Sequence, residues 1–202
     1  MSGLLPAELA TRDAYDTHAE TWMQAHNTPG FWREEMERFH RLLPAGDILE
    51  IGCGAGRDAA ELRLMGYGYT GIDFSAAMIA LSRARLPTAD FRQQSIYSLD
   101  IPERTFDGFW AAMSLVHIPK ARMDEALTRI GSQLRDGAVG FIALKHGDGE
   151  GLSDSDTPGM TRFFAWWQKD EFAGVLARNG YQVADNYRAG SRHCFFVVFQ
   201  RP

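Results

Sequence analysis

The segment ILEIGCGAGRDAAEL, residues 48–62, places three alternating glycines between an apolar run and an alanine-rich stretch. Ile48–Ile51 is typical of a buried strand, and Arg57–Met65 is typical of a helix. Glycine adopts positive φ angles without strain and lets a ligand touch the main chain, while the N-terminus of the following helix offers free N–H groups to an anion. The segment therefore predicts a ligand-binding loop at the carboxyl edge of a sheet.

Strand-like and helical patterns alternate along the chain after this loop. The further expected strands are Tyr67–Ile72, Ala89–Gln94, Phe106–Ala112 and Ala138–Leu144, and the expected helices are Ser75–Arg85 and Lys120–Leu134. Ser75 is a plausible N-cap for its helix. Strands separated by helices imply right-handed crossovers and a mostly parallel sheet.

The C-terminal part departs from this alternation. Tyr181–Asn186 and Cys194–Gln200 follow the expected helix Lys169–Asn179 without a further helix between them, so these two strands should pair antiparallel. Gly180 suits the position that follows the helix. The predicted fold class is α/β: a Rossmann-like, seven-stranded, mostly parallel sheet with an antiparallel C-terminal strand and helices on both faces.

The N-terminal part is expected to be helical from about residue 6 to residue 43, with a break at Pro29 and Gly30. We expect one domain over residues 1–202, in which residues 1–44 form a helical N-terminal cap and residues 45–202 form the Rossmann-like core. His146–Gly159 is rich in glycine, aspartate and serine, which predicts a mobile loop.

Composition narrows the class of protein. The chain of 202 residues has a net charge of −5 at pH 7, which argues against general nucleic-acid binding because that needs clustered Lys and Arg. The first residues show no basic and apolar pattern of a signal peptide, and no stretch is apolar enough to suggest a membrane partner. Cys53 and Cys194 lie far apart and lack metal-ligand spacing, so we expect no metal site and a cytoplasmic location.

The positions of the glycines in this loop help to distinguish between kinds of cofactor. Asp73 ends the second expected strand, where a carboxylate accepts hydrogen bonds from ribose hydroxyls in nucleotide-binding folds. That feature suits either a dinucleotide or another nucleoside cofactor. A dinucleotide fingerprint G-x-G-x-x-G needs glycine where this chain has Arg57, and Gly56 lies one position too early. The loop therefore argues against NAD.

The stretch ILEIGCGAG resembles the E/D-x-G-x-G-x-G motif of class I S-adenosylmethionine-dependent methyltransferases. Later segments resemble the family's subsequent motifs in the same order: YTGIDFSAAMIALSRAR, FRQQSIYSLDIP, FDGFWAAMSLVHIP, LRDGAVGFIALK, and EFAGVLARNGYQV as the closing helix and strand. The resemblance covers roughly residues 46–200, and the ordered set is more specific than any one motif.

The resemblance implies S-adenosyl-L-methionine as the cofactor. The three loop glycines should border its methionine part, Asp73 its ribose, and Ile96 should offer a backbone N–H to its adenine. Ser95 stands where the family commonly has aspartate, and its hydroxyl would accept from the adenine amine. The carboxylate of the cofactor suits the helix N-terminus and Arg57. The positions assigned to cofactor binding are Glu50, Gly52, Cys53, Gly54, Gly56, Arg57, Asp73, Phe74, Met78, Ser95, Ile96 and Ala111.

Two residues are candidates for catalysis. His117 follows the fourth expected strand, and histidine, with an ordinary pKa of about 6.5, suits removal of a proton at neutral pH. Tyr15 lies in a segment that resembles the part closing over the cofactor in related enzymes, where its ring would face the sulfonium. Simple packing is the alternative for both. Lys145 and Arg162 are candidates for contact with an anionic substrate, with solvated surface residues as the alternative.

The sequence thus predicts methyl transfer to a small-molecule acceptor by in-line displacement, by a monomer or homodimer with no nucleic-acid partner. A methyltransferase-like protein that binds the cofactor without turnover is the main alternative. An NAD-dependent oxidoreductase is a weaker alternative, because the glycine loop departs from the dinucleotide fingerprint.

Overall fold

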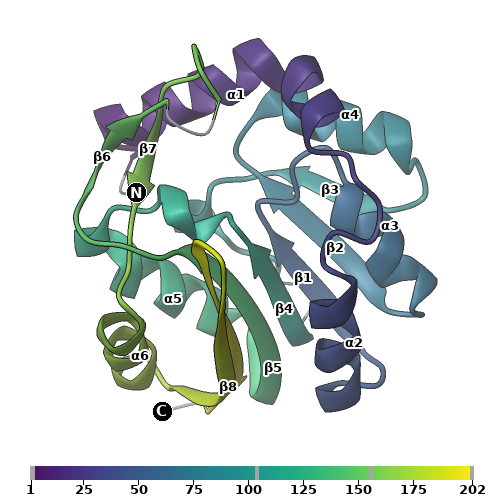
Figure 1. Cartoon of the computed structure of the whole chain (residues 1–202). Helices are drawn as coiled ribbons and strands as arrows, with labels where there is room; N and C mark the ends of the chain where they lie inside the picture. Colours follow the sequence, from purple (N-terminus) through teal and green to yellow (C-terminus); the bar gives the residue numbers. More distant parts are fainter. Residues whose placement is uncertain (1–2, 103–104, 155–156, 201–202) are drawn as a thin grey trace.

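The computed structural model describes residues 3–102, 105–154 and 157–200. A seven-stranded sheet in the order β3-β2-β1-β4-β5-β9-β8 forms its centre (Figure 1). The strands of this sheet are β1 Asp47–Ile51, β2 Gly68–Asp73, β3 Asp90–Gln93, β4 Phe106–Ala112, β5 Leu134–Lys145, β8 Tyr181–Ala189 and β9 Arg192–Phe199. The α-helices are α1 Pro6–Ala25, α2 Arg33–Leu42, α3 Arg57–Leu64, α4 Ala76–Arg85, α5 Met123–Ser132 and α6 Lys169–Arg178.

The sheet has the topology expected from the alternating patterns. β1 pairs in parallel with both β2 and β4, and β5 continues the parallel part beside β4. β9 runs antiparallel to β5 and to β8, so a single strand reverses direction near the C-terminus. The prediction of a mostly parallel seven-stranded sheet with an antiparallel C-terminal strand is confirmed.

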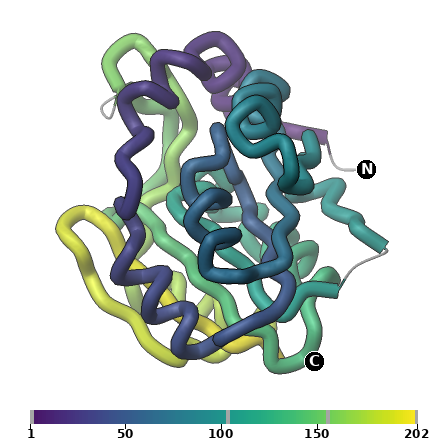
Figure 2. Tube along the Cα trace, turned by 90° about the vertical axis from the view of Figure 1, so that its right-hand side faces the viewer, coloured from purple at the N-terminus to yellow at the C-terminus, as the bar shows by residue number. Residues whose placement is uncertain are grey.

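Helices cover both faces because neighbouring strand residues point to opposite sides. Leu49 and Phe109 face the core that contains α5 and α6, whereas Ile48 and Trp110 face the core that contains α2 and α3. Figure 1 shows these two helical layers on either side of the sheet, and Figure 2 shows the chain descending from α1 to α2 beside it. The apolar strands are therefore enclosed as in other parallel sheets.

Local signals in the sequence set several element ends. The Ser75 hydroxyl accepts a hydrogen bond of 3.1 Å from the Met78 N–H and caps α4. Gly180 follows α6 with φ of +82°, a conformation that glycine adopts without strain. Both predictions are confirmed. The expected helix Lys120–Leu134 is shorter, because residues 120–122 form the 3₁₀ turn η3 and Leu134 already pairs with Phe106 at the start of β5.

The mobile loop predicted for His146–Gly159 is wrong for its described residues. Glu150–Ser153 forms strand β6, which pairs antiparallel with β7, Arg162–Ala165, in a second sheet. The short sequence of β6, EGLS, shows no apolar alternation, so its pairing depends on the buried aromatic partner strand. Residues 155 and 156 lie outside the described residues.

The second sheet and α1 lie along the carboxyl edge of the main sheet (Figure 1). The Phe163 N–H of β7 donates a hydrogen bond of 2.8 Å to the Thr11 hydroxyl of α1. The 3₁₀ turns η1, Ile96–Ser98, and η2, Leu115–His117, lie at the ends of β3 and β4. Within the described residues no helix is both long and apolar enough to cross a bilayer.

Candidate active site

A cavity of about 420 Å³ lies at the carboxyl edge of the sheet. Its walls come from α1, the loop after β1, the ends of β2, β3 and β4, and β7. This volume lies in the range of pockets that enclose small ligands, and open α/β sheets bind ligands at this edge. The fold therefore brings segments that are far apart in sequence around one candidate site.

The loop after β1 has the backbone conformation that requires glycine. Gly52 and Gly54 have φ of +70° and +51° and line the cavity. A Cβ atom at Gly52 would lie 2.4 Å from the Cβ of Ser114. Gly56, with φ of +76°, precedes α3 and packs against Phe91 and Ser82 without lining the cavity. Two of the glycines therefore expose main chain to a ligand, and the third allows close helix packing.

Asp73 ends β2 and lines the same cavity. Its carboxylate accepts hydrogen bonds of 2.9 Å from the Gly54 N–H and of 2.9 Å from the Ser75 N–H. Burial raises the pKa of this carboxyl from 3.8 to about 6, although the main-chain donors oppose the shift. The group is therefore positioned by the glycine loop and is easily protonated in mildly acidic solution.

The wall beyond Asp73 contains the predicted positions Phe74, Met78, Ser95 and Ile96. The Ser95 hydroxyl accepts from the Tyr97 N–H at 3.3 Å and so caps η1. The neighbouring Gln94, which the motif did not indicate, also lines the cavity. Its amide nitrogen donates to the Ser98 carbonyl at 2.8 Å, while its buried Oε1 atom has no hydrogen-bond partner within the described part of the chain. A buried acceptor atom without a described partner thus lies next to Ser95, and the motif alone could not reveal it.

Four of the predicted cofactor positions lie elsewhere. Glu50 and Cys53 border a second cavity of about 50 Å³, which shares Gly52 and Gly54 with the first, whereas Gly56 and Ala111 line neither cavity. Burial raises the pKa of the Glu50 carboxyl, which accepts a hydrogen bond from the Tyr69 hydroxyl.

Residues that follow Ala111 line the large cavity in its place. Ala112, the last residue of β4, and Met113 after it are on its wall. Met113 has φ of +60°, the one positive value of a non-glycine residue in the described ranges. Such strained conformations gather at functional sites.

Tyr15, His117 and Arg162 form a hydrogen-bonded cluster at the other end of the cavity. The Phe163 carbonyl lies 2.6 Å from His117 Nδ1, and a carbonyl only accepts, so this nitrogen carries a proton. In the neutral imidazole Nε2 then accepts from the Tyr15 hydroxyl, 2.9 Å away. Arg162 Nη1 donates to the same hydroxyl oxygen at 3.1 Å. The two candidate catalytic residues, although 102 positions apart, are therefore in direct contact.

Cationic and aromatic side chains line the cavity. Lys145 Nζ lies 4.5 Å from the centre of the Phe164 ring. Arg192 lies 4.7 Å from the ring centre of Trp32, on the same cavity wall. Arg57 also lines the cavity and donates to Asp58 at 2.6 Å. The cavity wall therefore combines apolar surface with cationic side chains.

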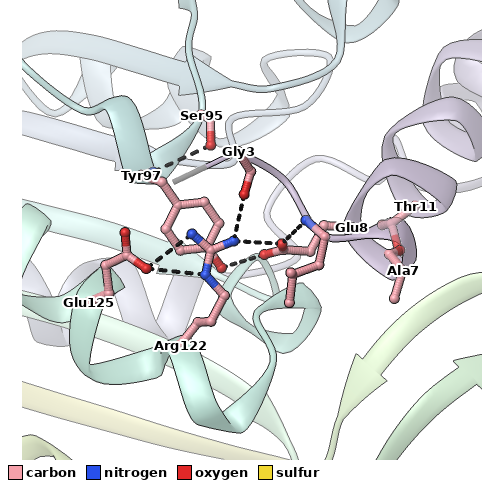
Figure 3. Close-up of polar contacts among 9 residues, drawn as sticks. Gly3, Ala7, Glu8, Thr11, Ser95, Tyr97, Arg122 and Glu125 are labelled. Atoms are coloured by element: carbon pink, nitrogen blue, oxygen red, sulfur yellow. Dashed lines mark hydrogen bonds and ion pairs between the residues drawn. The ribbon is translucent and has the colours of Figure 1, made fainter. Parts of the chain in front are cut away.

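The start of α1 is fastened to the core by a buried carboxylate. Glu8 accepts from Arg122 Nη1 at 2.8 Å, from the Leu5 N–H at 2.7 Å and from the Tyr97 hydroxyl, as Figure 3 shows. Arg122 also donates to Glu125 at 3.0 Å and lies over the Tyr97 ring. Because Tyr97 follows Ile96 on the cavity wall, this cluster holds the helix that covers the site.

We expect Arg122→Ala to lower the free energy of unfolding by about 3–5 kcal/mol, because it leaves the Glu8 carboxylate buried and unpaired. Arg12→Ala is the matched control. It removes an arginine whose ion pair with Asp13 is exposed, so we expect a change of about 1 kcal/mol or less. Urea unfolding of both variants measures the difference. Equal losses would contradict the assigned role of Glu8.

The fold and the geometry of the site define a class of protein. A mostly parallel α/β sheet with a glycine loop after its first strand and a buried carboxylate at the end of the second is a Rossmann-like nucleoside-binding fold.

Comparisons with known proteins agree with this class. A family described as "Methyltransferase domain" matches residues 48–137. The O-methyltransferase cnsE of Penicillium expansum is 30% identical over 162 residues, which cover 72% of this chain and 56% of that protein. An O-methyltransferase of Pyrenophora dematioidea is 32% identical over 165 residues, covering 76% of this chain and 61% of that protein. The chain thus spans less than two thirds of the length of either relative.

A solved structure shares the fold over the whole chain. It is the 1,6-didemethyltoxoflavin-N1-methyltransferase of Burkholderia thailandensis, with bound 1,6-didemethyltoxoflavin and S-adenosylhomocysteine. The TM-score is 0.79 at 19% identity, and the match covers 100% of this chain and 93% of the other. With the ordered motifs, these matches show that the chain belongs to the class I S-adenosylmethionine-dependent methyltransferases.

Proposed function

We propose that the protein transfers the methyl group of S-adenosyl-L-methionine to a small-molecule acceptor. The observation that carries this proposal is the cavity of about 420 Å³. It joins the glycine loop and Asp73 at one end to the cluster of Tyr15, His117 and Arg162 at the other. A cofactor and an acceptor bound side by side need such a two-ended site.

The residues of the first end suit this cofactor. Gly52 has no room for a Cβ, so its main chain forms a close-fitting wall. The Asp73 carboxylate suits the two ribose hydroxyls, and the unpaired Gln94 Oε1 suits the adenine amine beside Ile96. When bound, the cofactor supplies an electrophilic sulfonium methyl group. This cofactor has no phosphate group, so it does not require the G-x-G-x-x-G loop that binds the phosphates of a dinucleotide.

At the second end the chain's own residues would position the acceptor and move its proton. Proximity and orientation contribute about 7–11 kcal/mol in well-aligned reactions. A general base contributes a further factor of about 10²–10⁴. The Tyr15 oxygen would take a proton from the acceptor as the Tyr15 hydroxyl passes its own proton to His117 Nε2. The hydrogen bond from His117 Nδ1 to Phe163 holds the imidazole ready for this step.

The proposal is tested by incubating the protein with methyl-labelled S-adenosylmethionine and a panel of small hydroxyl, amine, thiol and carboxyl acceptors. We expect formation of labelled product and S-adenosylhomocysteine with a subset of them. Tight binding of S-adenosylhomocysteine without turnover on any acceptor would favour the cofactor-binding protein that does not catalyse. A cytoplasmic location and a monomeric or homodimeric state stay predictions.

His117→Ala is expected to lower kcat by about a hundredfold, because the Tyr15 hydroxyl loses the acceptor of its proton. The dissociation constant of S-adenosylhomocysteine should stay within about threefold, a change of less than about 0.7 kcal/mol. Steady-state kinetics with an acceptor from the panel, together with calorimetry, separate the two effects. Unchanged turnover from about pH 6 to about pH 9 would exclude His117 from the proton transfer.

The affinity for S-adenosylhomocysteine is expected to fall in mildly acidic solution. Ribose hydroxyls donate to the ionised carboxylate, so binding favours the deprotonated form of Asp73. As the pH drops through the pKa of about 6, a growing fraction of the protein must lose a proton before it binds. Below that pH the dissociation constant should rise by up to about tenfold per pH unit.

Calorimetry between about pH 5 and about pH 8 measures this dependence. Asp73→Asn is the control, since it should remove the dependence together with much of the affinity. A wild-type affinity that stays constant across this range would contradict the role given to the Asp73 carboxylate.

A further inference from the structure

Arg162 is a buried cation on the wall of the cavity. The residue is 4% exposed and begins β7. Its guanidinium donates to two neutral groups, the Tyr15 hydroxyl at 3.1 Å and the Thr157 hydroxyl at 3.2 Å. Its buried Nε atom has no hydrogen-bond partner, and no carboxylate of residues 3–102, 105–154 and 157–200 forms an ion pair with it.

A second arginine of the same chain shows how a structural arginine is neutralised. Arg122 pairs with Glu8 at 2.8 Å and with Glu125 at 3.0 Å (Figure 3). Moving a charge out of water costs several kcal/mol, so a buried cation normally has such partners. A buried arginine that served packing alone would need such a carboxylate partner, and Arg162 has none among the described residues. Its charge is therefore available to a ligand of opposite sign.

A second cationic side chain, Lys145, lies near Arg162 on the cavity wall. Lys145 Nζ and the Arg162 guanidinium lie 4.5 Å and 5.1 Å from the centre of the same Phe164 ring. Among the described residues, the acidic ones on the cavity wall are Glu8, which is paired with Arg122, and Asp73, which accepts from the glycine loop. Two cationic side chains therefore lie against one aromatic ring at the acceptor end of a chain whose net charge is −5.

We propose that the acceptor is a small organic acid whose carboxylate binds Arg162. This inference rests on the proposed function and adds the substrate class. A planar guanidinium with a donor still unused matches the geometry of a carboxylate. The bound carboxylate would lie next to the Tyr15 hydroxyl, and Phe164 would contact the rest of the acceptor. Arg162 is then the residue that determines specificity for acids over neutral analogues.

The test uses protein loaded with S-adenosylhomocysteine and matched pairs of probes: hydroxybenzoates and dihydroxybenzoates, hydroxy-substituted aliphatic acids, and the primary amide of each. Inorganic phosphate and methylphosphonate are added separately. Thermal shift and calorimetry measure binding to the loaded protein, and labelled methyl transfer measures turnover. We expect an acid to bind at least about tenfold more tightly than its amide, a difference of about 1.4 kcal/mol.

Arg162→Gln should abolish the preference for the acid and leave the affinity for S-adenosylhomocysteine within about threefold. Arg162→Lys should retain part of the preference as a point charge, which shows that the site still folds. Arg178→Gln is the matched control, because that arginine pairs with Asp124 on the surface and does not line the cavity.

The proposal is overturned if amides bind as well as acids, if Arg162→Gln keeps the preference, or if none of the acids binds the loaded protein. Binding of phosphate or methylphosphonate in place of the carboxylic acids would also overturn it. Each of these results leaves cofactor binding intact and so differs from failure of the proposed function, in which S-adenosylhomocysteine does not bind or no acceptor is methylated.

Discussion

Asp73→Asn is expected to weaken binding of S-adenosylhomocysteine by at least about a hundredfold. Hydrogen bonds to a charged group contribute about 1.5–3 kcal/mol each, and the carboxylate would accept from two ribose hydroxyls. Asparagine also turns one acceptor oxygen into an NH₂ group. That group would face the N–H of Gly54 or of Ser75, each of which donates to the carboxylate at 2.9 Å in the native chain.

Calorimetric titration of both proteins measures this loss. Asp90→Asn is the matched control, because Asp90 begins the neighbouring strand β3, pairs with Arg92 and does not line the cavity. It should bind like the wild type. An Asp73→Asn protein that binds within about threefold of the wild type would contradict the placement of the ribose.

Gly52→Ala is expected to damage both stability and cofactor binding. The new Cβ would lie 2.4 Å from the Cβ of Ser114, and the residue would keep a φ of +70°. A left-handed conformation costs about 1–2 kcal/mol for a residue with a Cβ. Overpacking costs about 1–3 kcal/mol more. We therefore expect a loss of about 2–5 kcal/mol in the free energy of unfolding, together with loss of detectable binding of S-adenosylhomocysteine.

Gly66→Ala separates backbone strain from the clash. Gly66 has φ of +94°, and a Cβ there would meet no atom within 4 Å. Its substitution should cost only about 1–2 kcal/mol and leave binding unchanged. Urea unfolding and calorimetry on the two variants measure both effects. Equal costs, with binding retained by Gly52→Ala, would show that the loop does not form a tight wall.

The parts of the fold that local sequence signals determine could be predicted. The apolar strands, the Ser75 cap and Gly180 each depend on neighbouring residues, and their alternation restricts the sheet to few topologies. β6 could not be predicted in this way. It is a short strand with one large apolar residue, Leu152, and it forms because β7 offers a buried partner.

Part of the candidate site could likewise be predicted from the sequence, and part of it could not. The glycine loop and Asp73 are predictable because the motif is contiguous and the acid ends the next strand. The contact of Arg162 with Tyr15 joins residues 147 positions apart, so no periodicity in the sequence reveals it. The orientation of the Gln94 amide depends on its bond to the Ser98 carbonyl, and the sequence does not contain that geometry.

Titration of S-adenosylhomocysteine and, separately, of NAD into the wild-type protein tests the central claim most directly. The account predicts binding of S-adenosylhomocysteine with a dissociation constant of about micromolar, or about −8 kcal/mol, and no binding of NAD. Binding of NAD without binding of S-adenosylhomocysteine would contradict it.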